Sequence, residues 1–181
     1  YGQAMSGVVN AVLRRGTDKF RWDAAVLTGG YLYAGGKRSV PDDFHEVRPF
    51  GIRSFQGSAS GPLGLPKTYY LVSARSYAGE DYLSAVRFFR ATDESDLAAH
   101  IYRPTGDRET EPLGYSREWS GVAKLTNRSL PAIELNYQAI FNRQSNRNAD
   151  WAFRINPEGM SRQRTLSIVH GLDLTHALSK T

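Results

Sequence analysis

The sequence of 181 residues contains no cysteine. A disulfide framework and a zinc site with cysteine ligands are therefore excluded for this chain. The sequence also has no run of about 18 apolar residues, which a membrane-spanning helix needs. This second absence does not exclude the membrane, because a transmembrane β-strand needs only about 10 residues of alternating hydrophobicity, which a hydropathy scan misses.

Common catalytic signatures are also missing. There is no P-loop, no HExxH zinc motif and no Ser-His-Asp signature. The four histidines (His45, His100, His170 and His176) fall in different segments, and only the last two share an expected strand. We therefore predict that the protein is not an enzyme, and we assign no catalytic, cofactor-binding or metal residue.

Carboxylates gather in three places outside the expected strands. Residues 42–43 and 80–81 are acidic pairs that we interpret as solvated loop charge. Asp93, Glu94 and Asp96 lack the glycine and the terminal glutamate of an EF-hand calcium loop. None of the three groups predicts a metal site.

The charge balance is basic, with a net charge of +5 and a pI near 9.6. Such a balance suits nucleic acid or an anionic surface. However, lysine and arginine are scattered along the chain, and no RNA-recognition, zinc-finger or helix-turn-helix signature appears. We therefore do not expect nucleic acid as a partner.

What the sequence does contain is alternation with period two, which predicts β-strands with one apolar face. In 132–142, for example, Ile133, Leu135 and Tyr137 alternate with polar residues. Gly57 indicates a bulge or a close approach in the second strand. The six expected strands are 20–33, 49–60, 68–78, 118–126, 132–142 and 165–178.

The connections between these strands alternate in length. Those near 34–48, 79–117 and 143–164 are long and polar, whereas 61–67 and 127–131 are short turns. Within the second long segment, 82–90 is compatible with a short extra strand. Short turns on one side and long loops on the other are typical of up-and-down outer-membrane barrels.

The first 20 residues, YGQAMSGVVNAVLRRGTDKF, carry a more specific pattern. They resemble the end of the plug domain of TonB-dependent outer-membrane receptors. In that family a Tyr-Gly, a small-residue stretch and a Gly-Val-Val-Asn strand lead through a basic Gly-Thr turn into the first barrel strand.

Later segments resemble the same family in the same order. Residues 55–62 are similar to the second strand and its Gly-Pro turn, and 69–88 look like the third strand leading into an aromatic, basic outer loop. Residues 156–159 with 166–179 resemble the third loop and sixth strand of the Oar-like branch.

This resemblance implies an all-β fragment of an antiparallel up-and-down transmembrane β-barrel, with about six strands, preceded by the last plug strand. Residues 1–17 would be the C-terminal end of the plug, and 18–181 the first of about 22 barrel strands. The implied function is energised uptake of a ligand across the cell outer membrane, without covalent chemistry. The implied partners are the TonB complex, acting through a part of the receptor not present here, an unknown extracellular ligand, and outer-membrane lipid.

In such a barrel, Trp22 and Trp119 would be anchors at the lipid interface. Tyr31 and Tyr33 lie on the polar face of their strand and support this girdle less directly. The residues expected to face the lumen are Asp23, Arg75, Lys124, Glu134, Asn136 and Gln138. They either line a substrate path or only form hydrogen bonds with one another and with water. We favour the second role, so ligand-binding residues stay unassigned.

Two other classes of protein remain as alternatives. Alternating apolar faces also suit a soluble all-β ligand-binding or adhesin module, whose strands are half-buried in an ordinary core. A basic β-protein that binds nucleic acid is the weaker option. Detergent dependence, a monomer in plain buffer, or a steep salt-dependent shift with an oligonucleotide would distinguish the three.

Overall fold

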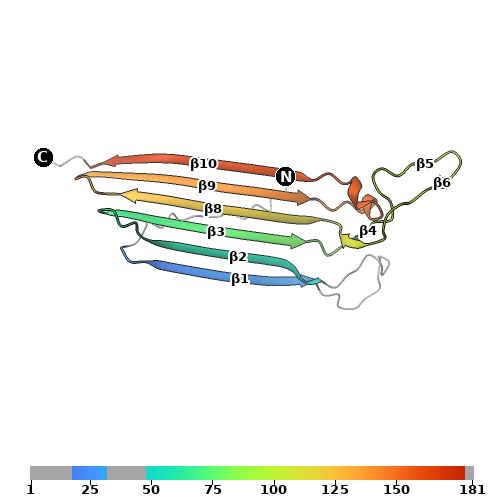
Figure 1. Cartoon of the computed structure of the whole chain (residues 1–181), viewed down its shortest axis with the longest axis horizontal. Helices are drawn as coiled ribbons and strands as arrows, with labels where there is room; N and C mark the ends of the chain where they lie inside the picture. The colour runs from blue at the N-terminus through green and yellow to red at the C-terminus, as the bar shows by residue number, and fades with distance from the viewer. Residues whose placement is uncertain (1–17, 32–47, 178–181) are drawn as a thin grey trace, which may run out of the picture.

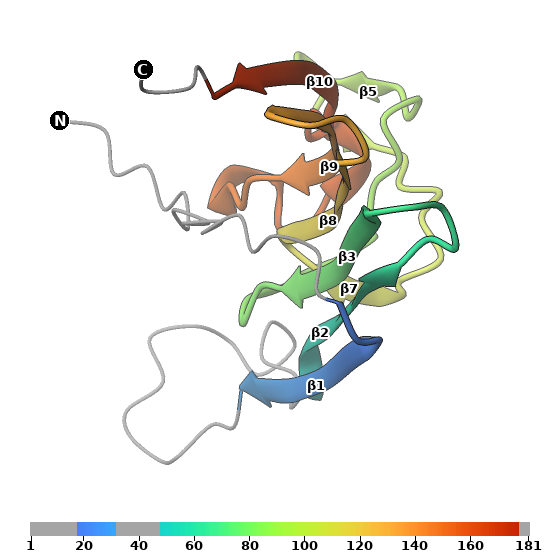
Figure 2. The same cartoon turned by 90° about the vertical axis from the view of Figure 1, so that its left-hand side faces the viewer.

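The computed structural model describes residues 18–31 and 48–177. Its main feature is one six-stranded antiparallel sheet with the order β1-β2-β3-β8-β9-β10 (Figure 1). The strands are β1 (Arg21–Tyr31), β2 (Arg48–Pro62), β3 (Thr68–Glu80), β8 (Tyr115–Asn127), β9 (Ile133–Arg147) and β10 (Gln163–His176). The predictions of an all-β chain and of six antiparallel strands are confirmed. Seen along its strands, the sheet is curved rather than flat (Figure 2).

The register of the sheet separates an apolar face from a polar one. Val26, Phe55 and Trp119 fall in one row across the strands, together with Leu166. The adjacent row on the other face contains Gln56, Arg75, Ser120, Asn142 and Ser167. Because side chains alternate along a strand, one consistent register keeps the two sets apart. The alternation in the sequence therefore predicted the faces of all six strands.

The strand ends were predicted less well than the faces. The expected strand 132–142 continues to Arg147, which pairs with Tyr115, so its partner also begins three residues before the expected Glu118. Charged and amide side chains at 143–147 indicated a loop, but they lie on a ladder that continues past the apolar band. The expected last plug strand and the loop 34–47 lie outside the described residues.

Gly57 marks neither of the two features expected there, a bulge or a close approach, because a Cβ at this position would stand 3.5 Å from the Asp23 carbonyl oxygen, an ordinary contact distance. Pairing continues through Gly57 on both sides, with Ala24 and with Ala74. The irregularity of β1 lies instead between Gly29 and Tyr31. There a Cβ on Gly30 would stand 1.8 Å from the Arg48 carbonyl oxygen, so only glycine permits this approach of the two strands.

Both described short turns lie at one end of the sheet, and the described long connections 81–114 and 148–162 lie at the other (Figure 1). The turn at 63–67 contains Gly64 at φ 83° and Lys67 at φ 47°, and the turn at 128–132 contains Ala132 at φ 60°. These left-handed residues reverse the chain within five positions.

The long connections 81–114 and 148–162 fold together, and we call them the loop cap. The cap contains the pair β4 (Ser84–Val86) and β7 (Thr110–Pro112), the hairpin β5 (Ser95–Asp96) and β6 (Ile101–Tyr102), and the 3-10 turns η2 (Trp151–Phe153) and η3 (Pro157–Gly159). The extra strand expected within 82–90 is β4. Val86 donates its backbone N–H to Arg154 (2.7 Å) and Phe89 donates to Ile155 (2.9 Å), which joins the two connections.

The buried apolar core of the described residues lies in this cap rather than on the sheet. Ala85, Leu113 and Met160 are buried, and Leu83 and Phe153 pack against them. Both connections were expected to be long polar loops. Scattered apolar residues from two distant segments carry no period, so the sequence pattern did not reveal that they meet.

No helix in the part of the chain that the structure describes is long and apolar enough to cross a membrane.

Candidate functional site

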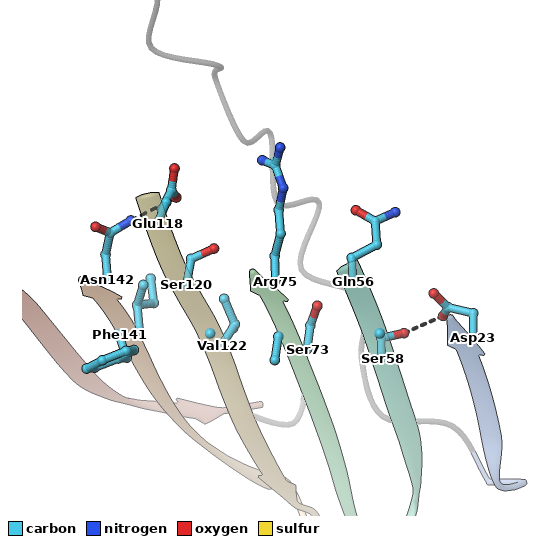
Figure 3. A pocket seen from close by; sticks show the side chains of 14 residues that line it. Asp23, Gln56, Ser58, Ser73, Arg75, Glu118, Ser120, Val122, Phe141 and Asn142 are labelled. Carbon is cyan, nitrogen blue, oxygen red and sulfur yellow. Dashed lines mark hydrogen bonds between the residues drawn. The ribbon is translucent and has the colours of Figure 1, made fainter. Parts of the chain in front are cut away.

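The polar face of the sheet is hollowed into a groove of about 590 Å³, which we call the polar groove (Figure 3). Five strands contribute to it, from β1 to β9. Its polar side chains are Asp23, Gln56, Ser58, Ser73, Arg75, Glu118, Ser120 and Asn142. Figure 3 shows those of Gln56, Arg75 and Glu118 pointing to the same side of the sheet.

The charges of the polar groove are hydrogen-bonded to neutral neighbours. Ser58 donates to Asp23, and Asn142 Nδ2 donates to Glu118 Oε1 at 3.1 Å. Arg75 donates to Ser54 Oγ at 3.3 Å and lies 5.3 Å from the centre of the Tyr77 ring. Within residues 18–31 and 48–177, none of the three charges forms an ion pair. The groove therefore keeps both signs of charge available to a polar ligand.

A second polar cluster on the same face lies toward the short turns. Glu134 accepts from Arg128 Nε and Asn136 Nδ2, both at 2.9 Å, and Thr126 donates to Asn136 at 2.7 Å. On the opposite face at the same end, Asn127 Nδ2 donates to Thr68 Oγ1 at 2.7 Å. These groups satisfy one another, so the cluster stabilises the turn end of the sheet and offers few free groups for binding.

The six residues expected to face a lumen all lie on this polar face. Asp23 and Arg75 line the groove, and Glu134 and Asn136 belong to the cluster beside the turns. Lys124 and Gln138 are direct partners across β8 and β9. Sequence reasoning did not single out Gln56, Glu118 or Asn142, although their positions on the polar side of each alternating strand were a usable signal.

A second hollow, of about 630 Å³, lies where the loop cap joins β9 and β10. Its lining combines amide side chains with the ring of Trp151, which is 36% exposed. Asp150 caps η2 by accepting from Ala152 N–H at 2.9 Å, and the Arg154 guanidinium lies 5.2 Å from the Trp151 ring centre. An aromatic face beside amide donors and acceptors suits a polar ligand with an apolar side.

An ionic network holds the loop cap in place. Glu111 accepts from Arg147 at 2.8 Å and from Arg87 at 3.0 Å. Burial tends to raise the pKa of Glu111, but the hydrogen bonds from the two guanidinium groups outweigh it and hold the pKa below its ordinary value. The Arg87 pKa is raised, mainly by its bond to Glu111 and then by its bond to Asp107. Glu111 and the two arginines therefore stabilise one another's charged forms, and together they hold the loop cap in its folded position.

Arg147 is the buried member of this network, with 3% of its side chain exposed. It also donates from Nε to the Leu113 carbonyl at 3.1 Å and from Nη2 to the Pro112 carbonyl. It therefore ties the end of β9 to β7 and to the core of the cap.

The described histidines do not form a site. His170 lies on the apolar face beside Tyr137, with 6.4 Å between ring centres, and His176 lies at the end of the same strand. His100 lies in the tight turn between β5 and β6 at φ 54°. His45 is outside the described residues.

The acidic residues of the second long connection cap turns. Asp93 accepts from the backbone N–H groups of Arg90 and Thr105, both at 2.9 Å, and Asp96 accepts from Ala98 and Ala99. The Thr105 hydroxyl bond is the main cause that lowers the pKa of Asp93. Among the described residues, no group of three or more histidines and carboxylates is placed to hold a metal ion. Residues 42–43 lie outside the described chain.

We compared the chain with models of known protein families, with curated proteins and with solved structures, and nothing in any of the three sets matches it. A function for this chain must therefore be inferred from its own residues and from the two faces of its sheet.

Proposed function

We propose that this chain forms part of the wall of a transmembrane β-barrel in the cell outer membrane, within a TonB-dependent receptor of the Oar-like kind. The observation that carries the proposal is the exposed apolar face of the sheet. Trp22, Ile168 and Leu172 are 70%, 66% and 64% exposed, and no layer of described residues covers them. A water-soluble monomer rarely leaves an apolar surface of this extent uncovered.

Burying this face is strongly favourable. Each Å² of apolar surface removed from water is worth about 25 cal/mol, so a large exposed side chain gains about 1.5–3 kcal/mol when it is covered. The large apolar side chains of this face that are more than one-third exposed are Trp22, Val26, Phe55, Val72, Trp119, Leu125, Leu135, Tyr137, Phe141, Leu166, Ile168, Leu172 and Leu174. Either lipid or a second protein layer must cover so many side chains.

The dimensions of the strands favour lipid. A tilted transmembrane strand needs about 9–11 residues, and the six strands contain between 11 and 15. The described connections also keep the order of short turns at one end and a long folded cap at the other, which outer-membrane barrels share.

The distribution of residue sizes on the apolar face favours the same environment. Across the middle of four neighbouring strands runs a row of small residues, namely Ala24, Gly57, Ala74 and Gly121. Phe55 and Trp119 lie on the cap side of this row, and Trp22 and Tyr70 lie on the turn side. Aromatic residues at the edge of an apolar band are typical of a bilayer interface, and Phe55 and Trp119 lie directly before Arg53 and Arg117 at the cap end of this face.

The edges of the sheet support a larger barrel. β1 and β10 each pair on one side only within the described chain. Unpaired backbone groups are not tolerated in lipid, so a membrane-spanning sheet must close on itself. In the proposed receptor, further strands complete the barrel, as the family resemblance implies.

The polar face then lines the interior of the barrel. The loop cap, with the hollow beside Trp151 where it joins β9 and β10, would capture an extracellular ligand, and the polar groove would line its path. The charges of the groove and the amides of the hollow suit a polar ligand. Energy from the TonB complex would admit it, through binding and gating without a covalent step; the TonB requirement is supported by the sequence resemblance alone.

Cysteine labelling in the full gene product, produced in its own cell envelope, tests this proposal. The chain has no native cysteine, so each introduced thiol in it reports one position. Three variants probe the apolar side of β9 (L135C, Y137C and F141C) and three probe the polar side (N136C, Q138C and N142C). We expect a water-soluble maleimide to label the polar set, while a lipid-soluble reagent labels the apolar set.

Repeating the labelling after extraction separates the proposal from its main alternative. A barrel stays in solution only with detergent, and its apolar set is shielded from the water-soluble reagent by that detergent. If the apolar set is shielded in a protein that is monomeric in plain buffer, the face is the core of a soluble module. That result would overturn the proposal, as would equal labelling of both sets in the envelope.

A further inference from the structure

Four arginines surround a hollow of about 860 Å³ on the apolar face, at the end near the loop cap. We call Arg117, Arg143, Arg162 and Arg164 the arginine cluster. All four are exposed, and they come from β8, β9 and the region where β10 begins. Arg117 of β8 and Arg164 of β10 both pair with Ser145 of β9, from its two sides, so their side chains share one face.

The cluster has no matching negative charge. Within the described part of the chain, none of the four arginines forms an ion pair with a carboxylate. Arg117 lies 4.9 Å from the centre of the Tyr115 ring. Glu80 and Glu111 line a smaller hollow together with Arg117 and Arg162. Glu111 is already bonded to Arg87 and Arg147, so the cluster keeps a net positive charge.

The same hollow has an apolar side. Trp119, Phe141 and Leu166 line it together with the arginines, and they begin the apolar band of the sheet. Arg143 lies between Trp119 and Leu166 in the same row. A ligand that fits this surface has an anionic group at the cap end and an apolar part directed along the strands.

We propose that the arginine cluster binds the phosphate of a lipid headgroup in the outer leaflet. This inference rests on the proposed membrane location of the apolar face. Guanidinium groups present planar pairs of donors that match phosphate oxygens, so arginine suits this anion better than lysine does. Gathering four like charges is unfavourable by itself, and a bound phosphate offsets that repulsion. The acyl chains would lie along Trp119, Phe141 and Leu166.

The test compares two lipids that differ only in phosphate: dioleoyl phosphatidic acid and dioleoylglycerol. The full gene product is held in micelles of an uncharged detergent, and native mass spectrometry measures the lipid that it retains. We expect the parent protein to bind phosphatidic acid at least about tenfold more tightly than dioleoylglycerol. In the double variant R143Q/R164Q this preference should fall to less than about twofold.

A matched double variant controls for overall charge. Arg53 lies in the same row of the apolar face as Arg117 and Arg164 but does not line the hollow, and Arg103 is exposed in the loop cap. R53Q/R103Q removes the same charge and should keep the preference for phosphatidic acid within about twofold of the parent. Circular dichroism of the sheet checks that each variant is folded.

Three results would overturn the lipid site. The parent protein could bind both lipids equally, the control could lose as much affinity as R143Q/R164Q, or inorganic phosphate could bind as tightly as phosphatidic acid. The last result would show a site for free phosphate. Failure here is distinct from failure of the barrel, because a protein that passes the cysteine test and ignores headgroup phosphate loses only this site.

Discussion

The sheet and the loop cap of this protein are built in opposite ways. The sheet contains most of the apolar side chains and leaves them exposed on one face, whereas the cap buries a small core of Ala85, Leu113 and Met160. The sheet is held by its ladders and by polar bonds on its other face. The cap is held by its core and by a buried arginine.

This difference teaches that the two regions depend on different surroundings. The cap has its own interior, so its stability depends on contacts within the chain. No described residues cover the apolar face of the sheet. The stability of the sheet therefore depends on the surroundings that cover this face, which we propose are lipid. Changes in the cap should therefore act in any solvent, and changes on the apolar face should depend on the medium.

The largest expected effect follows from removing Arg147. In R147M, the Leu113 and Pro112 carbonyls lose their donor and Glu111 loses one of its two cations. Breaking a buried ion pair costs about 3–5 kcal/mol. We expect amides of β4 and β7 to lose most of their protection in hydrogen exchange, while central β3 and β8 amides keep theirs.

The matched control for Arg147 is R154Q, which removes a partly exposed arginine from the same cap. Its effect should be below about 1 kcal/mol, because its contacts are to the Trp151 ring and carbonyl at the surface. If the β4 and β7 amides exchange hydrogen at the same rate in R147M and in R154Q, Arg147 does not hold the cap.

The next largest effect is expected from two leucine-to-alanine substitutions, one in the cap and one on the apolar face of the sheet. L113A leaves a cavity in the cap and should destabilise it by about 2–4 kcal/mol. L172A, on the apolar face, removes a side chain that is 64% exposed and should change stability by less than about 0.5 kcal/mol if water surrounds it. In lipid bilayers L172A should cost more than this. Denaturant titrations in bilayers measure both variants, and a cost for L172A below about 0.5 kcal/mol there would weaken the distinction between the regions.

Acid should weaken the cap by a smaller amount. Glu111, Asp107 and Asp93 have pKa values below their ordinary range; for Asp107 the main cause is the Glu109 backbone N–H, with a further contribution from Arg87. Carboxyls with lowered pKa values stabilise the fold above their ordinary pKa, and this contribution is lost as pH falls through the folded value. We expect cap amides to exchange faster below about pH 4, after correction for the intrinsic rate.

The control for the pH effect is E111Q, which removes the titrating group that joins Arg87 and Arg147. It should be less stable than the parent at pH 7 and should show a smaller further loss in acid. An equal loss of protection in the parent and in E111Q between pH 7 and pH 3 would assign the acid sensitivity to other groups.

Local pattern predicted the faces of the sheet well because strand alternation is a local property. Leu135 is apolar and Gln138 is polar, and they lie at an odd and an even position of the same strand, which point to opposite faces. Both properties can be read directly from the sequence. The same reasoning ended β9 too early, since the polar residues up to Arg147 resemble a loop until their pairing with β8 is known.

The polar groove was only partly accessible to sequence reasoning. Asp23 and Arg75 were identified as residues of one face, but the hollow that joins them with Glu118 depends on the register of neighbouring strands. The register is set by pairing between strands that lie far apart in the sequence, so it cannot be read from a single sequence.

The sequence by itself determined the all-β class, the six strands, their two faces and the alternation of long and short connections. Each of these depends on residues close together in the chain. Only the tertiary structure decided that the two long connections share a core, that Arg147 is buried, and that four scattered arginines gather around one hollow. These features join residues far apart in the sequence, and their physical basis is contact in space, which no local period records.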